Sequence, residues 1–262
     1  MNNTRPTALI TGASSGIGEV FAREFAARGY DLIIAARRTD RLNTVAKSIT
    51  AETGAAVKVL AADLSVPNSA AKLAKAVGST PVDVLVNNAG WGSIGPFSGE
   101  DLSSMADEIN VNVIALTQLS RLFVGPMIER GRGTIINIAS TAAYQPVPNM
   151  SVYAATKAYV LSFTEGLWGE LQGTGVTAIA VSPGGTATEF FDVAGGRAMS
   201  GGLMTPAQVV ATALSALDAS SPAPSVIVGA RNRVMAVAGR FVPKRQLITV
   251  AKTLMKSDKR HT

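Results

Sequence analysis

Short apolar runs alternate with longer amphipathic stretches along most of this chain, and that alternation restricts the possible folds more than any other feature. Most of the runs are continuously apolar, which is typical of strands covered on both faces of a sheet. We expect strands at residues 8–11, 31–36, 57–61, 82–86, 134–139, 176–181 and 225–228. The amphipathic stretches predict helices at residues 16–28, 40–53, 68–78, 101–129, 152–172 and 206–218.

Alternating strands and helices favour parallel strands joined by right-handed crossovers. The predicted fold class is therefore α/β, a Rossmann-like, doubly wound parallel sheet of about seven strands in a three-layer α/β/α arrangement. We interpret residues 1–262 as a single domain. Within it, the glycine-rich residues 184–204 predict a mobile flap, and residues 231–262 form a basic tail that also carries Val, Met, Leu and Phe.

The residue inventory excludes several kinds of chemistry. The chain has no cysteine, which rules out disulfides, thiolate metal sites and cysteine nucleophiles. The single histidine is His261, so we predict no metal site. There is no basic stripe interleaved with aromatic residues, and we expect no binding to nucleic acid.

The N-terminal apolar run is too short for a signal peptide, and no run of about 18 uninterrupted apolar residues is present to form a spanning helix. We therefore expect a cytoplasmic protein. The formal net charge is +6, and much of the positive charge lies in the tail. Such a tail can be an ordinary solvated surface. It can also lie on an anionic membrane surface or form a helix that packs on the domain or on a neighbouring subunit, and of these two we favour the second.

The first predicted strand runs into a glycine-rich turn, Thr11-Gly12-Ala13-Ser14-Ser15-Gly16-Ile17-Gly18, and a predicted helix follows. Such a turn lets backbone N–H groups approach a pyrophosphate at a helix N-terminus, where the helix dipole favours negative charge. The spacing differs from the commoner G-x-G-x-x-G, and no Lys follows it as in a P-loop. An ordinary turn is the alternative in a chain with 25 glycines, but the position between strand and helix favours a dinucleotide site.

The second predicted strand ends in Arg37 and Arg38, where an NAD-preferring site usually has Asp or Glu. Two guanidinium groups at this position can hold a 2′-phosphate through charge-assisted hydrogen bonds. The alternative is a pair of exposed loop arginines. The pattern favours NADP over NAD.

Further polar and small residues follow the third and fourth predicted strands. Asp63 and Leu64 follow the third strand, and Asn88, Ala89 and Gly90 follow the fourth. An Asp there can accept a hydrogen bond from an adenine amino group, and small residues leave room for a ribose; both sets can also be ordinary turn residues. Their shared place at the carboxyl edge of the sheet, where ligands bind in such folds, favours the first interpretation.

Of the four tyrosines, only Tyr153 has a Lys four residues later, Lys157. Residues i and i+4 share a helix face, so the ammonium can lie near the phenol and favour the phenolate. The pair could then exchange a proton with a carbonyl or alcohol, although a surface Tyr packed on a Lys stem fits the same spacing. Ser140, at the end of the fifth predicted strand, favours the first reading because its hydroxyl can return beside the phenol.

Taken in order, these motifs resemble those of the short-chain dehydrogenase/reductase family. The resemblance covers roughly residues 5–230 and rests on Thr11-Gly12-x3-Gly16-Ile17-Gly18, Asp63, Asn87-Asn88-Ala89-Gly90, Asn112, Ser140, Tyr153-x3-Lys157 and Pro183-Gly184. It implies an NADP(H)-dependent oxidoreductase that moves a hydride between the nicotinamide and a carbonyl or alcohol.

The resemblance also implies a role for each matching residue. Tyr153 would be the general acid/base, Lys157 would lower the pKa of its phenol and bind the nicotinamide ribose, and Ser140 would bind the substrate oxygen. Asn112 would hold a water that links Lys157 to solvent, whereas the sequence alone leaves it as a helix-kink residue. The predicted cofactor contacts are Gly12, Ser14, Ser15, Gly16, Ile17, Gly18, Arg37, Arg38, Asp63, Leu64, Asn88, Ala89, Gly90, Tyr153, Lys157, Pro183, Gly184, Thr186 and Thr188.

Substrate selectivity should lie in the flap and the nearby loops. The candidate wall residues are mainly apolar and include no evident Arg or Lys clamp: Trp91, Ile94, Phe97, Ala142, Tyr144, Val147, Phe190, Phe191 and Met204. We therefore expect a small-molecule substrate that is a hydrophobic ketone, aldehyde or secondary alcohol. The family resemblance implies a homodimer or homotetramer paired through the helices at 101–129 and 152–172. The competing functions are a catalytically inactive NADP(H)-binding sensor or scaffold, and a membrane-associated lipid carbonyl reductase.

Overall fold

A parallel seven-stranded sheet forms the centre of the protein in the computed structural model, which describes residues 5–190, 194, 203–239 and 241–256. Its strand order is β3-β2-β1-β4-β5-β6-β7, and every neighbouring pair is parallel. The strands are β1 (Thr7–Thr11), β2 (Asp31–Ala36), β3 (Val57–Ala61), β4 (Val84–Asn87), β5 (Gly133–Ile138), β6 (Val176–Ser182) and β7 (Ser225–Ile227). The predicted fold class is confirmed, with strand ends shifted by one or two residues.

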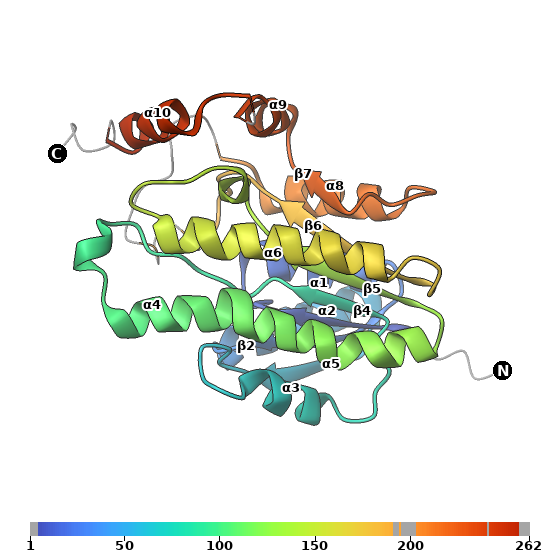
Figure 1. Ribbon diagram of the computed structural model, residues 1–262. Coiled ribbons are helices and arrows are strands. Elements are labelled where there is room, and N and C mark those ends of the chain that lie inside the picture. Colours follow the sequence, from blue (N-terminus) through green and yellow to red (C-terminus); the bar gives the residue numbers. More distant parts are fainter. Residues whose placement is uncertain (1–4, 191–193, 195–202, 240, 257–262) are drawn as a thin grey trace.

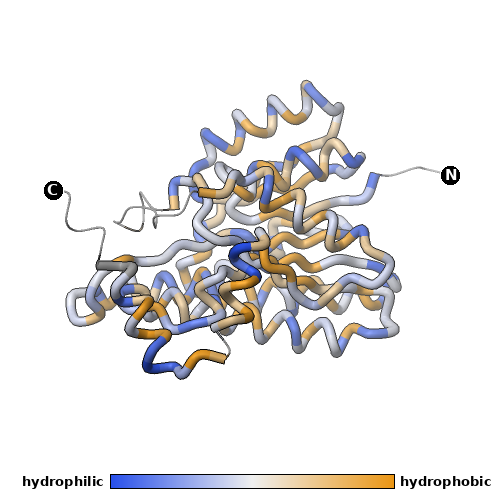
Figure 2. Tube along the Cα trace, turned by 90° about the horizontal axis from the view of Figure 1, so that it is seen from above, coloured by the Kyte–Doolittle hydropathy of each residue, from blue (hydrophilic) through white to orange (hydrophobic). Residues whose placement is uncertain are grey.

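Helices cover both faces of this sheet, which gives the three layers (Figure 1). One face is covered by α1 (Gly16–Ala27), α2 (Thr39–Thr53) and α8 (Pro206–Leu217). The other is covered by α3 (Ser69–Val77), α5 (Leu116–Glu129) and α6 (Ser151–Glu170). The central strands are buried on both sides, as their continuous apolar sequences require, and Figure 2 shows hydrophobic residues gathered along them.

The helix predicted at 101–129 is divided into three parts. Asp101 caps α4 (Leu102–Ile109) by accepting a hydrogen bond from the Ser104 N–H at 2.8 Å. A π-helical segment, Asn110–Ala115, then leads into α5. By length and composition the whole stretch Leu102–Glu129 could cross a membrane, but core helices of folded domains meet the same criterion, and here α5 packs on β4 and β5.

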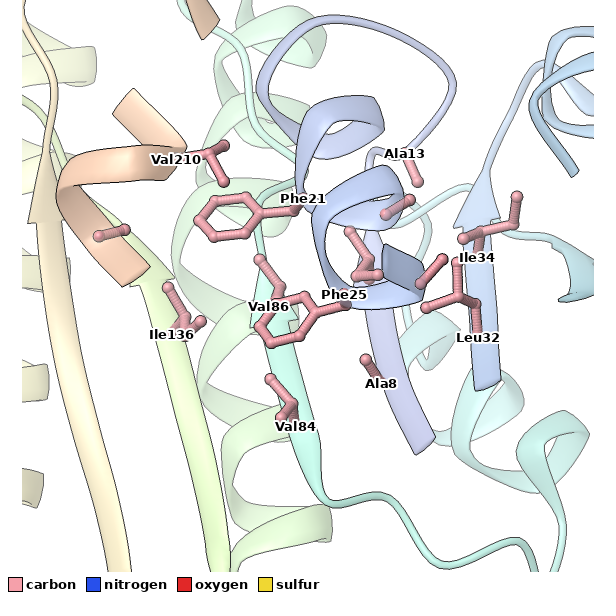
Figure 3. Close-up of a cluster of buried hydrophobic side chains, with 14 of the residues drawn as sticks. Ala8, Ala13, Phe21, Phe25, Leu32, Ile34, Val84, Val86, Ile136 and Val210 are labelled. Atoms are coloured by element: carbon pink, nitrogen blue, oxygen red, sulfur yellow. The ribbon is translucent and has the colours of Figure 1, made fainter. Parts of the chain in front are cut away.

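The aromatic residues of α1 anchor one of the cores. Phe21 is fully buried and stacks on Phe25 with 6.1 Å between ring centroids. Figure 3 shows both rings projecting from α1 over the sheet, toward Val86 and toward Val210 of α8. Because α1 begins at the glycine-rich turn, this packing also sets the position of that turn.

The described part of the basic tail forms two helices, α9 (Ala230–Gly239) and α10 (Lys244–Lys256), which lie beyond β7 (Figure 1). The α9 helix packs on the 3₁₀ turn Thr141–Tyr144 that follows β5. Part of the predicted flap, residues 191–193 and 195–202, lies outside the described residues.

Large apolar side chains are exposed on the π-helical segment, α5 and α6, which together form one side of the protein. They are Ile114, Leu122, Ile128 and Tyr159. An exposed apolar face of this kind is typical of a subunit interface. We therefore predict that the chain self-associates through this face.

Leu122→Glu should shift the protein toward monomer, because burying the new carboxylate in an apolar interface is unfavourable. Sedimentation velocity at micromolar concentration measures this shift. Val66→Glu, at an exposed apolar position outside these helices, is the matched control and should leave the sedimentation coefficient unchanged. A monomeric parent protein would contradict the prediction.

Candidate active site

One pocket of 1390 Å³ runs along the carboxyl edge of the sheet, from the glycine-rich turn to Tyr153. It collects residues that follow β1, β2, β3, β4, β5 and β6, as expected for a doubly wound sheet. The predicted site residues that line it are Gly12, Ser14, Ser15, Gly16, Ile17, Arg37, Arg38, Asp63, Leu64, Asn88, Ala89, Gly90, Ser140, Tyr153, Lys157, Pro183, Gly184, Thr186 and Thr188. Gly18 and Asn112 are not among the lining residues.

The glycine-rich turn depends on close backbone contacts. Gly12 and Gly16 have φ angles of +68° and +60°, which side chains disfavour. A Cβ on Gly18 would lie 2.4 Å from the Gly12 carbonyl oxygen, so Gly18 is needed for packing rather than for contact with the pocket. The Asn88 amide nitrogen donates to the carbonyl oxygens of Thr11 at 2.9 Å and Gly12 at 3.2 Å. Asn88 therefore holds the turn in shape.

The N-terminus of α1 opens onto the pocket. Its N-cap residue, Ser15, makes no side-chain capping hydrogen bond to the helix. Both Ser15 and Ser14 instead accept hydrogen bonds from Arg38 Nη2, at 3.0 and 3.2 Å. The backbone N–H groups of the first turn thus have no side-chain oxygen from the cap, which is the arrangement that binds anions at helix ends.

A cluster of three charged side chains lies at the adenosine end predicted from the sequence. Glu189 forms ion pairs with Arg41 and with Arg38, whose Nη1 is 2.7 Å from Glu189 Oε2. Hydrogen bonds from Arg41 and then Arg38 lower the pKa of Glu189 to about 2. Arg37 is exposed and lines the same end of the pocket. Sequence reasoning did not select Glu189 or Arg41 for this site.

The sequence left open whether Asp63 is a turn residue or part of the cofactor site, and in the structure it closes a turn and also lines the pocket. Its Oδ1 accepts hydrogen bonds from the Ser65 N–H at 3.0 Å and from the Ser65 hydroxyl at 2.8 Å, which closes a turn after β3. The residue also lines the pocket. Thr186 is buried, and its hydroxyl donates to the Gly184 carbonyl oxygen at 3.0 Å.

Ser140, Tyr153 and Lys157 meet in the pocket. Ser140 follows β5 and hydrogen-bonds to the phenol of Tyr153, which lies in the first turn of α6. Lys157, one turn later, is 4% exposed, and its ammonium lies 5.7 Å from the centroid of the tyrosine ring. The same ammonium donates to the Ile138 carbonyl oxygen at 2.8 Å. The i, i+4 spacing thus places the cation beside the phenol, as the sequence predicted.

Burial dominates the ionisation of this pair. It raises the pKa of Tyr153 to about 12, although the hydrogen bond from Ser140 acts in the opposite direction. It also lowers the pKa of Lys157 to about 8. The expected lowering of the Tyr153 pKa by Lys157 is not found in this geometry: desolvation of the phenol has the largest effect, and Lys157 is not among the groups that shift this pKa.

Asn112 lies inside the π-helical segment and is fully buried. Its amide nitrogen donates to the Trp91 carbonyl oxygen at 2.8 Å and to the Thr156 hydroxyl at 3.1 Å, and its oxygen accepts from the Trp91 N–H at 3.2 Å. Glycine is required at position 90, where a Cβ would lie 2.7 Å from Asn112 Oδ1. Asn112 therefore ties the loop after β4 to α6.

The substrate end of the pocket is mostly apolar. The predicted wall residues that line it are Trp91, Ile94, Ala142, Tyr144, Val147, Phe190 and Met204. The placement of Phe97 was wrong: it lies in the 3₁₀ turn Phe97–Gly99 and is 61% exposed. Phe191 lies outside the described residues. The tail contributes wall residues that sequence reasoning missed, including Arg231, Met235 and Ala251.

Comparison with known proteins places these features in a family. Residues 6–195 match the family described as short chain dehydrogenase. A short chain dehydrogenase from Pseudocercospora fijiensis (strain CIRAD86) is 41% identical over 187 residues, which make up 70% of this chain and 60% of that relative. The chain thus spans less than two thirds of that relative's length.

Solved structures match over nearly the whole chain. A short-chain dehydrogenase from Sphingobium yanoikuyae in complex with NADPH has a TM-score of 0.81 and 33% identity, with 98% of both chains covered. The bulky-bulky ketone specific alcohol dehydrogenase from Comamonas testosteroni has a TM-score of 0.79 and 31% identity, with 99% of this chain and 97% of that chain covered. Because the family match begins before β1 and runs past Tyr153 and Lys157, it includes most of the residues that build the pocket, and the chain belongs to the short-chain dehydrogenase family.

Proposed function

We propose that this protein is an NADP(H)-dependent oxidoreductase that interconverts apolar ketones or aldehydes and their alcohols. The observation that carries the proposal is the meeting of Ser140, Tyr153 and Lys157 in the same pocket as the anion-binding turn at α1. Membership of the short-chain dehydrogenase family supports it. An inactive sensor would not need a buried lysine beside a partly buried phenol at such a position.

The pocket fits a dinucleotide. Gly12 and Gly16 let the turn pack closely at the N-terminus of α1, where a Cβ on Gly16 would lie 2.9 Å from a methyl of Thr188. The first turn of α1 would hold the pyrophosphate, and Asp63 would bind the adenine side. Residues from Pro183 to Thr188 would lie over the nicotinamide, which gives or accepts the hydride when bound.

Tyr153 would move the proton. With a pKa of about 12 its phenol is protonated at neutral pH, so it can donate to the oxygen of a carbonyl substrate. In the reverse direction its phenolate takes the proton of an alcohol. The Ser140 hydroxyl would hydrogen-bond to the same substrate oxygen and stabilise its developing charge. The Lys157 ammonium would bind the ribose of the nicotinamide.

The preference for NADP rests on the cationic end of the pocket. Arg38 is held by two serines, and Arg37 and Arg41 lie beside it, whereas no acidic residue ends β2. A 2′-phosphate would bind these guanidinium groups either in place of the Glu189 carboxylate or together with it. The NADPH complex of the Sphingobium yanoikuyae neighbour supports this assignment.

The substrate class follows from the wall of the pocket. Aromatic and aliphatic side chains surround Tyr153, and the ring centroids of Tyr153 and Phe190 are 5.2 Å apart. Such a wall suits a bulky apolar carbonyl compound, as in the ketone-specific neighbour from Comamonas testosteroni.

We expect such an enzyme to work in the cytoplasm.

Tyr153→Phe should reduce turnover of an apolar ketone at least roughly 100-fold, because the proton donor is lost. NADPH binding, followed by fluorescence, should stay within about twofold because the ring still packs. Tyr159→Phe changes an exposed tyrosine of the same helix and should remain active. Turnover by Tyr153→Phe at the parent rate would reject the acid/base assignment.

Replacing Arg37 and Arg38 together by Ala should raise the Kd for NADPH by roughly ten- to a hundredfold, the effect expected for lost charge-assisted hydrogen bonds. The Kd for NADH should change by less than about threefold, because NADH lacks the 2′-phosphate. Arg28→Ala, which removes the distant ion pair with Asp218, serves as control. Equal weakening of both cofactors would contradict the proposed preference.

Lys157→Met should stabilise the protein at pH 7 even as it removes activity. The folded pKa of Lys157, about 8, lies below the usual 10.5, so the unfolded chain binds more protons between these pH values. Stability therefore rises with pH across this window, and the buried cation costs up to about 3 kcal/mol below it. Urea unfolding should show a gain of about 1–3 kcal/mol at pH 7 that shrinks toward pH 10. Lys72→Met, at an exposed position, should show neither effect; a less stable Lys157→Met protein would refute the argument.

A further inference from the structure

Two glutamates meet at one serine hydroxyl behind the active site. Ser93 Oγ lies 3.1 Å from Glu100 Oε1 and 3.2 Å from Glu108 Oε2. Glu108 Oε2 also accepts the backbone N–H of Ser93 at 3.1 Å. Glu108 has no exposed surface, and neither its Oε1 nor Glu100 Oε2 has a hydrogen-bond partner among the described residues.

Counting hydrogens shows that this arrangement needs an extra proton. A serine hydroxyl has one hydrogen and can donate it to only one carboxylate. The other carboxyl oxygen would then face a serine lone pair at hydrogen-bond distance, which is repulsive unless that carboxyl is protonated and donates. Two carboxylates that share a buried partner seldom ionise together, because each charge opposes the other.

The surroundings favour Glu108 as the group that carries the proton. Burial raises the pKa of Glu108, and the neighbouring charge of Glu100 adds to this, while hydrogen bonds from Ser93 and the charge of Lys157 oppose it. Glu108 in turn acts on the active site: its negative charge would raise the pKa values of both Tyr153 and Lys157.

Glu108 and Asn112 together hold the loop that packs against Tyr153. They lie four residues apart, on α4 and the π-helical segment. Asn112 binds both backbone groups of Trp91, and Glu108 binds the backbone of Ser93. Gly92 lies between these two points, so close to the tyrosine that a Cβ on it would lie 2.4 Å from the ring.

We propose that Glu108 is a positioning residue that works as a neutral carboxylic acid: its proton, shared through Ser93 with Glu100, holds the loop against Tyr153 and keeps negative charge away from the phenol. The inference rests on the proposed role of Tyr153 as the acid/base. Whether Glu108 carries this proton can be measured without any assumption about activity.

The first experiment looks for the proton directly. Infrared spectra of the parent protein at neutral pH should contain the carbonyl stretch of a protonated carboxylic acid, and Glu108→Gln should remove it. Glu52→Gln, which changes an exposed carboxylate, should leave the band intact. A parent protein without the band, or a band that persists in Glu108→Gln, would overturn the proposal.

The second experiment separates the neutral acid from a carboxylate. Gln is neutral, has the same shape as a protonated Glu, and can still accept from the Ser93 N–H through its oxygen, so Glu108→Gln should keep kcat at neutral pH within about threefold of the parent. Glu108→Ala loses both contacts and should lower kcat roughly tenfold or more through misplacement of Tyr153. Equal losses in the two variants, or no loss in either, would overturn the proposal; circular dichroism and the melting temperature verify that both fold.

The pH profile of alcohol oxidation reports whether Glu108 carries a charge. Oxidation requires the phenolate, and an ionised Glu108 would raise the pKa of Tyr153. A neutral Glu108 adds no such charge, so the midpoint of the rise in kcat/KM with pH should stay within about 0.2 unit of the parent in Glu108→Gln. A midpoint that falls by about half a unit or more in this variant would mean that Glu108 is ionised in the parent and would contradict the proposal. If Tyr153→Phe remained active, the proposed function would fail while the infrared result still reported the proton on Glu108.

Discussion

The geometry of the site depends on the buried amide of Asn112. Its three hydrogen bonds join the loop after β4 to Thr156 on α6, and they leave none of its polar atoms unpaired. A buried amide with all of its partners defines one arrangement of its neighbours, since any other leaves an unpaired polar group at a cost of roughly 1–3 kcal/mol. Asn112 lies inside the π-helical segment, and irregular helical turns of this kind are frequent at functional sites.

Around this amide the protein buries groups that would be more stable in water. Lys157 is almost fully buried with one carbonyl partner, Tyr153 is desolvated, and Glu108 is enclosed beside a second glutamate. Large apolar cores on both faces of the sheet provide the stability that tolerates these groups. Such strained electrostatics are typical of catalytic sites, where pKa values must suit proton transfer.

The opposite end of the pocket holds charged side chains that are exposed to solvent. Glu189, from the segment after β6, bridges Arg38 and Arg41 at the start of α2. The residue that follows, Phe190, packs beside the ring of Tyr153. One short segment therefore contacts both the proposed 2′-phosphate site and the proposed acid/base, although the two lie at different ends of the pocket.

The amino-acid sequence by itself determined the parallel sheet, the glycine-rich turn and the pairing of Tyr153 with Lys157, because these follow from local periodicity and from the spacing of residues on one helix or turn. It also identified Ser140, since strand ends meet at one edge of a parallel sheet. Only the tertiary structure decided that Phe97 faces solvent, that Glu189 binds the arginines, that burial sets the ionisation of Tyr153, and that Glu108 and Glu100 meet at Ser93. These outcomes depend on desolvation and on contacts between segments distant in sequence or joined by irregular loops, and no local pattern records them.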